Sequence, residues 1–315
     1  MSIKTDLGTD PVTNPTRHAP ARQRGQVLAG LFLVVMWSSG FVGAELGTRQ
    51  APATTLLAWR YLVTGLVLVI ICLIVRPHFA RSDVLRQSVL GLLSQVCYLL
   101  PVYLGVERGV LAGTVSLLAA IQPLLVAVLA GPLLGEHTSI RQRLGLIVGF
   151  VGVLAVVSGD LGGGAAPWWA YLLPLIGMLS LSGGTLLGRR WQPSSLLVSL
   201  TVQTVTAAVA LMIIAETTGQ LRPPMVDGSG LLINADFALA VGWVAILSGL
   251  GGYGAYLLVL RKQGATAASS WLYLTPPVTM LWTWLMFGDR IGPTGLLGLI
   301  ITAVGVGLSI RRSRP

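Results

Sequence analysis

The amino-acid sequence predicts an all-α membrane protein, with ten transmembrane helices in two inverted five-helix repeats around a central cavity. The first observation behind this prediction is composition. Hydrophobic residues make up 54% of the chain and charged residues only 10%, whereas a soluble domain carries about 25% charged residues. The 315 residues have room for roughly ten spans of about 20 residues each. An internal repeat and the placement of basic residues are the other two observations.

The repeat covers most of the chain. Residues 96–157 align without a gap onto 249–310, so that Tyr103 falls on Tyr256 and Pro123 on Pro276. The front of each half also aligns, with Gly43 opposite Gly184. Each half holds an odd number of predicted spans, so the second half inserts upside down relative to the first. Many secondary transporters use such an inverted duplication to build two gates around one central site.

Apolar runs that end at charged residues, proline or glycine define the individual helices. Residues 1–26 are poor in apolar positions and predict a disordered cytoplasmic tail. The run from Val27 continues to Gly47 without a cleavage site for a signal peptide, so we expect a retained first helix. The first repeat is expected over 27–158 and the second over 168–310. The ten predicted spans are 27–47, 54–75, 88–106, 110–134, 142–158, 168–188, 195–215, 237–259, 267–287 and 293–310.

Basic residues predict the orientation of the helices. With the N-terminus in the cytoplasm, sixteen Lys and Arg residues fall in inside segments, four in outside segments and one, Arg60, within a span. Because Lys and Arg accumulate in cytoplasmic loops, both termini are expected to face the cytoplasm of a bacterial cell, with the chain in the inner membrane. The net charge of +10 is therefore explained by topology, and no nucleic-acid partner is expected.

Short motifs, several of them present in both halves at fixed spacing, together resemble the drug/metabolite transporter superfamily in its EamA-type branch. The resemblance covers about residues 27–310. The family often has Lys where this chain has Glu45, and Thr201 lies opposite Arg60 in the second repeat, which leaves the charge of the substrate open. The motifs are Trp37-Ser-Ser-Gly-Phe-Val-Gly, Pro52, Arg60, Gln122-Pro123, Leu134-Gly135-Glu136, Tyr273-Leu-Thr-Pro276-Pro277, Phe287-Gly288-Asp289 and Gly295-Leu-Leu-Gly298.

This resemblance implies a basket of helices. The first, third and fourth helices of each half would line a central cavity, and the fifth and tenth helices of the chain would lie at the periphery. Members of the family mostly export small organic metabolites, including amino acids, while some import solutes and others exchange sugar-phosphates or nucleotide-sugars.

Two pairs of polar side chains are candidates for the substrate site. Gln95 and Tyr98 stand three residues apart, as do Tyr253 and Tyr256, so each pair shares one helix face. Tyrosine rings inside a bundle can stack on an apolar solute while their hydroxyls orient it. The alternative is that these tyrosines belong to the aromatic belts at the membrane surfaces.

Prolines mark the next candidates. Gln122 precedes Pro123, and Trp271 and Thr275 precede Pro276. A proline within a span frees a carbonyl in the preceding turn, which could contact a solute or form a hinge. The alternative is a kink that serves helix packing alone.

Glu45 and Arg60 are the charges placed most clearly within spans, and they are candidates for a gate or for coupling. They could pair at the outer gate, or Glu45 could touch the substrate. The alternative is that they snorkel to the interface and form a structural ion pair. Small-residue pairs such as Gly43 with Gly47 and Gly184 with Gly188 predict close helix packing.

The sequence thus predicts a secondary transporter that moves small neutral or zwitterionic metabolites by alternating access, with efflux favoured. An importer or an exchanger, for example of sugar-phosphates, is the alternative. A membrane enzyme acting on lipid would need clustered catalytic side chains, and the three His residues lie far apart in the chain. No catalytic residue, metal or cofactor is expected. The expected partners are a small-molecule solute and the lipid bilayer, and a homodimer stays open.

Overall fold

A computed structural model describes residues 19–134, 139–161, 166–192, 195–226, 232–288 and 292–310. Helices account for the secondary structure of this part of the chain, apart from one isolated antiparallel bridge between Met225 and Ile233. The prediction of an all-α membrane protein is confirmed. Six of the described helical stretches are long and apolar enough to cross a membrane. The count of ten spans stays a prediction.

The first half begins earlier than expected. Helix α1 starts at Ala19, so residues 19–26 of the predicted tail are helical, and residues 1–18 lie outside the described residues. Ala, Arg and Gln are strong helix formers, which accounts for the extension. The elements of this half are α1 (Ala19–Thr48), α2 (Ala53–Val75), α3 (Arg81–Gly91), η1 (Leu92–Val96), α4 (Cys97–Glu107), α5 (Ala112–Ala119), α6 (Gln122–Leu134) and α7 (Ile140–Leu161).

The second half repeats this order of elements. The helix α8 takes the place of α1, α9 that of α2, and α14 that of α7. The elements are η2 (Trp168–Tyr171), α8 (Leu172–Arg190), α9 (Leu196–Thr217), α10 (Ala235–Trp243), η3 (Val244–Tyr253), α11 (Gly254–Gln263), α12 (Ala265–Leu272), α13 (Thr275–Phe287) and α14 (Pro293–Ile310).

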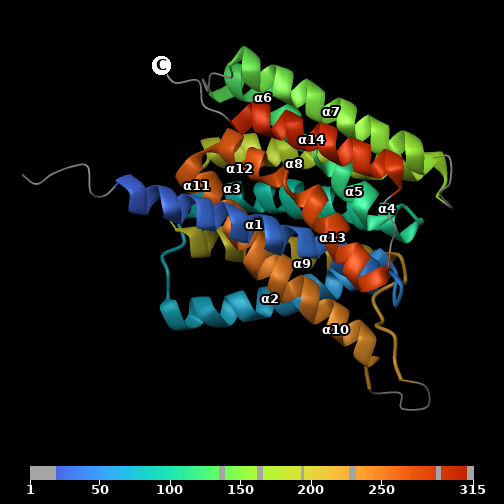
Figure 1. The fold of residues 1–315 in the computed structure, drawn as a ribbon. Helices are drawn as coiled ribbons and strands as arrows, with labels where there is room; N and C mark the ends of the chain where they lie inside the picture. Colours follow the sequence, from blue (N-terminus) through green and yellow to red (C-terminus); the bar gives the residue numbers. More distant parts are fainter. Residues whose placement is uncertain are drawn as a thin grey trace, which may run out of the picture.

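Helix packing follows the same duplication. Helix α1 of the first half packs against η3 of the second half. The equivalent helix α8 of the second half packs against α4 of the first half. Likewise α13 packs on α1, and its counterpart α6 packs on α8. The equivalent helices α2 and α9 pack against each other, as do α7 and α14, which lie side by side at one edge of the bundle (Figure 1). The peripheral position expected for the fifth and tenth helices is therefore observed for α7 and α14.

Glycines allow the closest helix contacts. A Cβ on Gly252 would lie 3.1 Å from the carbonyl of Met36 on α1, and one on Gly177 of α8 would lie 2.6 Å from the carbonyl oxygen of Tyr98. Gly43 fits against Val244 in the same way. Small residues therefore bring α1 and α8 close to the middle of the partner half, and Gly43, from one of the predicted GxxxG pairs, is among them.

Two spans are broken just before a proline, at equivalent positions. One break separates α5 from α6 ahead of Pro123, and the other separates α12 from α13 ahead of Pro276. Proline lacks the N–H that would bond the carbonyl four residues earlier. In the second break, the Thr275 hydroxyl donates to that carbonyl, the oxygen of Leu272, at 2.6 Å.

Two other spans contain π-helical turns, again at equivalent positions. The element η1 lies between α3 and α4, and the longer η3 lies between α10 and α11. A π-helix holds more residues per turn than an α-helix, and such turns often occur at functional sites. Both turns lie in spans that border the cavity described next.

Candidate functional site

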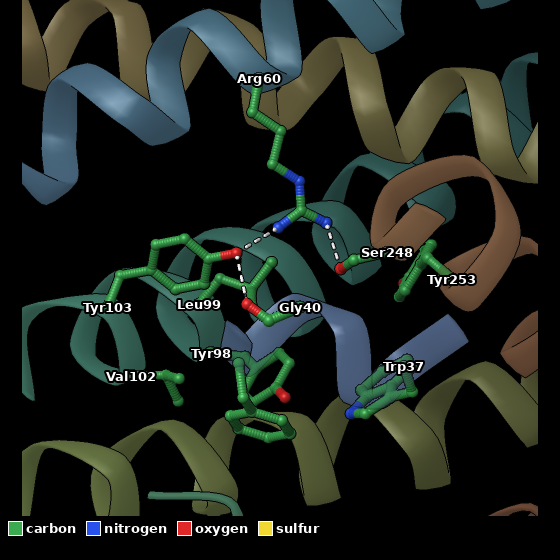
Figure 2. A pocket seen from close by; sticks show the side chains of 10 residues that line it. Trp37, Gly40, Arg60, Tyr98, Leu99, Val102, Tyr103, Ser248 and Tyr253 are labelled. Carbon is green, nitrogen blue, oxygen red and sulfur yellow. Dashed lines mark hydrogen bonds between the residues drawn. The ribbon is translucent and has the colours of Figure 1, made fainter. Parts of the chain in front are cut away.

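A small cavity lies in the bundle interior where α1, α2, α4 and η3 meet (Figure 2). Its volume is about 20 Å³. That is room for about one water molecule. The cavity is therefore narrow in this conformation. The lining residues are Trp37, Gly40, Phe41, Arg60, Tyr98, Leu99, Val102, Tyr103, Ser248 and Tyr253.

Arg60 brings a positive charge to this cavity. Its side chain is buried, at 2% exposure. The guanidinium donates to the Tyr103 hydroxyl at 3.2 Å and to the Ser248 hydroxyl at 3.3 Å, and it lies 5.0 Å from the centre of the Tyr61 ring. Its Nε has no hydrogen-bond partner among the described residues. Within the described part of the chain, no carboxylate lies within ion-pair distance of Arg60.

The hydroxyl of Tyr103 links Arg60 to the first helix. It accepts from the guanidinium and donates to the carbonyl of Gly40 at 3.1 Å, as Figure 2 shows. Gly40 in turn leaves space for Ser248, because a Cβ there would lie 2.6 Å from the Ser248 oxygen. The polar end of the cavity thus joins α1, α2, α4 and η3.

Aromatic rings form another part of the wall. Trp37 stacks on Tyr98, with ring centres 6.0 Å apart, and on Tyr253 at 6.4 Å. Tyr256 lies behind them, 5.1 Å from Trp37 and 5.7 Å from Tyr253. Stacked rings of this kind offer flat apolar faces to a bound solute.

A buried polar cluster continues from the aromatic wall. The Tyr253 hydroxyl donates to the side-chain oxygen of Gln203. The amide nitrogen of Gln203 donates to Gln87 at 2.6 Å, and the Ser199 hydroxyl also donates to Gln87 at 2.6 Å. Gln87, Ser199 and Gln203 border a second cavity, also of about 20 Å³, which Gln192 and Arg261 line as well.

The structure places two of the seven predicted substrate residues, Tyr98 and Tyr253, in the lining of the central cavity. Tyr256 packs at a tilt against Trp37 from outside this lining, and its hydroxyl lies 2.5 Å from that of Thr185. The amide nitrogen of Gln122 donates to the same Thr185 hydroxyl at 3.1 Å, so Gln122 and Tyr256 share one polar contact on α8.

Gln95 lies within η1 and is buried. Its amide nitrogen has no hydrogen-bond partner among the described residues. The structure does not place it in the lining of the central cavity.

Trp271 and Thr275 lie away from the cavity, contrary to the expectation of a shared pocket. The Trp271 ring fills the space over Gly30, where a Cβ would lie 2.0 Å from it, and its N–H donates to Gln263 at 3.3 Å. Thr275 uses its hydroxyl on the Leu272 carbonyl, so the carbonyl that the proline frees is already bonded. These two side chains serve the packing of α12 and α13.

Glu45 and Arg60 do not form the ion pair that the sequence suggested. Glu45 instead pairs with Arg49, one turn later on α1, at 2.5 Å. Residues four apart on a helix are neighbours, which favours this local pair. Glu45 and Arg49 border a separate surface cleft together with Glu107.

Trp37 and Ser248 are lining residues that the sequence did not single out as site residues. Trp37 belonged to a recognised motif, but nothing in its spacing showed that it faces Tyr98 and Tyr253 across three helices. Ser248 could not be assigned to the cavity from the sequence, because it lies in η3. A π-helical turn changes which residues of a span share a face, so α-helical spacing places Ser248 on the wrong face. The cavity is lined by the first, second, third and eighth spans, and not by the first, third and fourth of each half as the resemblance implied.

A duplicated bundle of membrane-length helices defines the class of polytopic membrane proteins. The chain belongs to the EamA-like transporter family, whose model matches residues 24–158 and 168–311.

Curated relatives cover nearly the whole chain. The uncharacterized inner membrane transporter YedA of Escherichia coli is 26% identical over 289 residues, 90% of each chain. A probable amino-acid metabolite efflux pump of Escherichia coli is 20% identical over 289 residues, 89% of this chain and 93% of the relative. A crystal structure with 17% identical residues matches with a TM-score of 0.69 over 91% of this chain and 97% of the other, which supports the fold.

Proposed function

We propose that this membrane transporter is a secondary transporter that moves a small neutral or zwitterionic metabolite with an apolar or aromatic body, by alternating access. The observation that carries the proposal is the narrow interior cavity between the two halves, walled by Trp37, Tyr98 and Tyr253. An aromatic wall with a few polar groups is typical of small-molecule sites.

The two repeats, over 27–158 and 168–310, would take opposite conformations around this site. In the described conformation the cavity is too small for a metabolite, so α1, α4 and η3 must move apart to admit one. The glycine contacts between α1 and η3, and between α8 and α4, give surfaces on which such movement can occur. The buried cluster of Gln87, Ser199 and Gln203 offers further polar groups next to the cavity, because Gln203 accepts from the lining residue Tyr253.

Efflux is the favoured direction, with support from the relative named as a probable amino-acid metabolite efflux pump. The alternative, exchange of sugar-phosphates, would bring two negative charges to a cavity that has one lining cation, Arg60. An uncompensated charge in a buried site is costly. Phosphorylated solutes are therefore expected to move poorly.

Transport in proteoliposomes tests the proposal. The panel contains neutral and zwitterionic amino acids, including leucine and phenylalanine, together with glucose 6-phosphate. We expect uptake or counterflow of at least one amino acid, and a loss of rate in Tyr98→Ala but not in Leu239→Ala, whose side chain is 71% exposed on the outside of the bundle. Robust exchange of the sugar-phosphate with no amino-acid transport would refute the proposal.

The orientation is part of the proposal, with both termini in the cytoplasm. Single cysteines replace Leu232, expected outside, and Ser82, expected inside, in a variant with Cys72 and Cys97 changed to Ser. An impermeant thiol reagent applied to intact cells should label the first position and spare the second. Reversed labelling would contradict the orientation.

A further inference from the structure

We propose that Arg60 binds a carboxylate group of the transported solute, so that the central cavity selects small monocarboxylates, including zwitterions, over neutral analogues. This inference rests on the proposed function and changes its substrate class: among the solutes proposed above it keeps those that carry a carboxylate, and it adds simple monocarboxylate anions.

The charge of Arg60 is not compensated by a carboxylate among the described residues. Buried cations in proteins are almost always paired with a carboxylate. The two hydrogen bonds of Arg60 go instead to the neutral hydroxyls of Tyr103 and Ser248, and both are long, at 3.2 and 3.3 Å. The ring of Tyr61 supplies part of the missing stabilisation. A negatively charged group that arrives with the solute would supply the rest.

The Arg60 guanidinium is also oriented to receive a carboxylate. Both terminal nitrogens of the guanidinium point toward the cavity lining, as Figure 2 shows, and form a fork that matches the two oxygens of a carboxylate. Ser248 accepts from one of these nitrogens, and among the described residues its own hydroxyl hydrogen has no acceptor. That hydroxyl can therefore donate to a bound carboxylate, whereas the Tyr103 hydroxyl is already committed to Gly40.

The charge and shape of the cavity lining match those of a monocarboxylate with an apolar body. Arg60 is the single charged residue of the lining in the described part of the chain, so it balances one negative charge and leaves a dianion in excess. Beyond the guanidinium, the lining consists largely of the rings of Trp37, Tyr98 and Tyr253 and of apolar side chains. The site therefore fits one carboxylate attached to an apolar or aromatic body.

Binding to the purified protein in detergent separates this role from a structural one. The probes are two matched pairs, 3-phenylpropionate with 3-phenylpropionamide and 4-methylpentanoate with 4-methylpentanamide, measured by titration calorimetry. Each amide has the shape of its acid without the charge. In the wild type we expect each acid to bind about 10- to 100-fold more tightly than its amide, the loss typical of one charge-assisted hydrogen-bonded contact.

Variants of Arg60 test whether this residue causes the preference for acids. Arg60→Gln should weaken binding of each acid to the level of its amide, and Arg60→Lys should retain part of the preference. Arg108→Gln serves as the matched control, because the Arg108 guanidinium lies over the Trp169 ring outside the cavity. If Arg60→Gln does not fold, the wild-type preference and its reduction in Arg60→Lys decide the question.

Equal binding of acids and amides by the wild type would overturn the inference, as would a preference that persists in Arg60→Gln or that is undiminished in Arg60→Lys. In either case amino-acid transport in proteoliposomes would still stand, and Arg60 would be a structural residue. Absence of any amino-acid transport together with phosphate exchange would instead refute the proposed function itself.

Discussion

The contact between α4 and α8 is so close at Gly177 that a larger residue there should destabilise the protein. A Cβ on Gly177 would lie 2.6 Å from the Tyr98 carbonyl oxygen, about 0.8 Å inside the 3.4 Å at which ordinary contacts begin. The atom it meets belongs to a backbone, so no side-chain rotation relieves the clash. Gly177→Ala must therefore push α8 away from α4, which costs about 1–3 kcal/mol for overpacking.

Gly183→Ala on the same helix is the matched control, because a Cβ there would meet nothing within 4 Å. Both substitutions bring the same gain in helix propensity, so their difference isolates the clash. Thermal unfolding in detergent, followed by fluorescence-detected size exclusion, should show a lower melting temperature for Gly177→Ala than for Gly183→Ala. Equal melting temperatures would refute the reasoning that this contact is rigid.

Two further predictions concern the aromatic wall. Tyr253→Phe removes the hydroxyl that donates to Gln203 and should lower the free energy of unfolding by about 1–3 kcal/mol, because a buried amide oxygen loses its partner; an unchanged melting temperature would contradict this. Trp37→Ala should reduce transport about tenfold or more, since it removes the ring that stacks on two lining tyrosines, whereas Trp271→Ala should leave the affinity for the solute unchanged. The same proteoliposome assay measures both variants, and equal losses would place the site elsewhere.

The class of fold could be predicted from the sequence because the relevant signals are local or periodic. Long apolar runs, and a repeat that aligns Tyr103 with Tyr256 without a gap, do not depend on how the helices pack. The positions of Tyr98 and Tyr253 at the cavity were predicted for a related reason, since polar aromatic residues inside a bundle tend to face its interior.

Other parts of the site depend on packing between helices, which the sequence does not encode in any short pattern. Trp271 looked like a cavity residue because it precedes Pro276, but a glycine on another helix, Gly30, provides the space for its ring. Arg60 and Glu45 looked like partners because both are charged and lie near the outer ends of their spans. Which hydroxyls face Arg60 is decided by the close approach of three other helices, and so could not be read from spacing.

The π-helical turns affect how the lining of this cavity can change between related transporters. Successive residues of an α-helix are rotated by about 100° around its axis. Loss of one residue from η1, with a return to α-helical winding, would therefore turn the upstream face that carries Gln87 relative to the downstream face that carries Tyr98. The equivalent change in η3 would act on Ser248 and Tyr253. Single-residue insertions and deletions at these two places can exchange a whole set of lining side chains in one step, so relatives can differ in solute while most of their aligned residues stay the same.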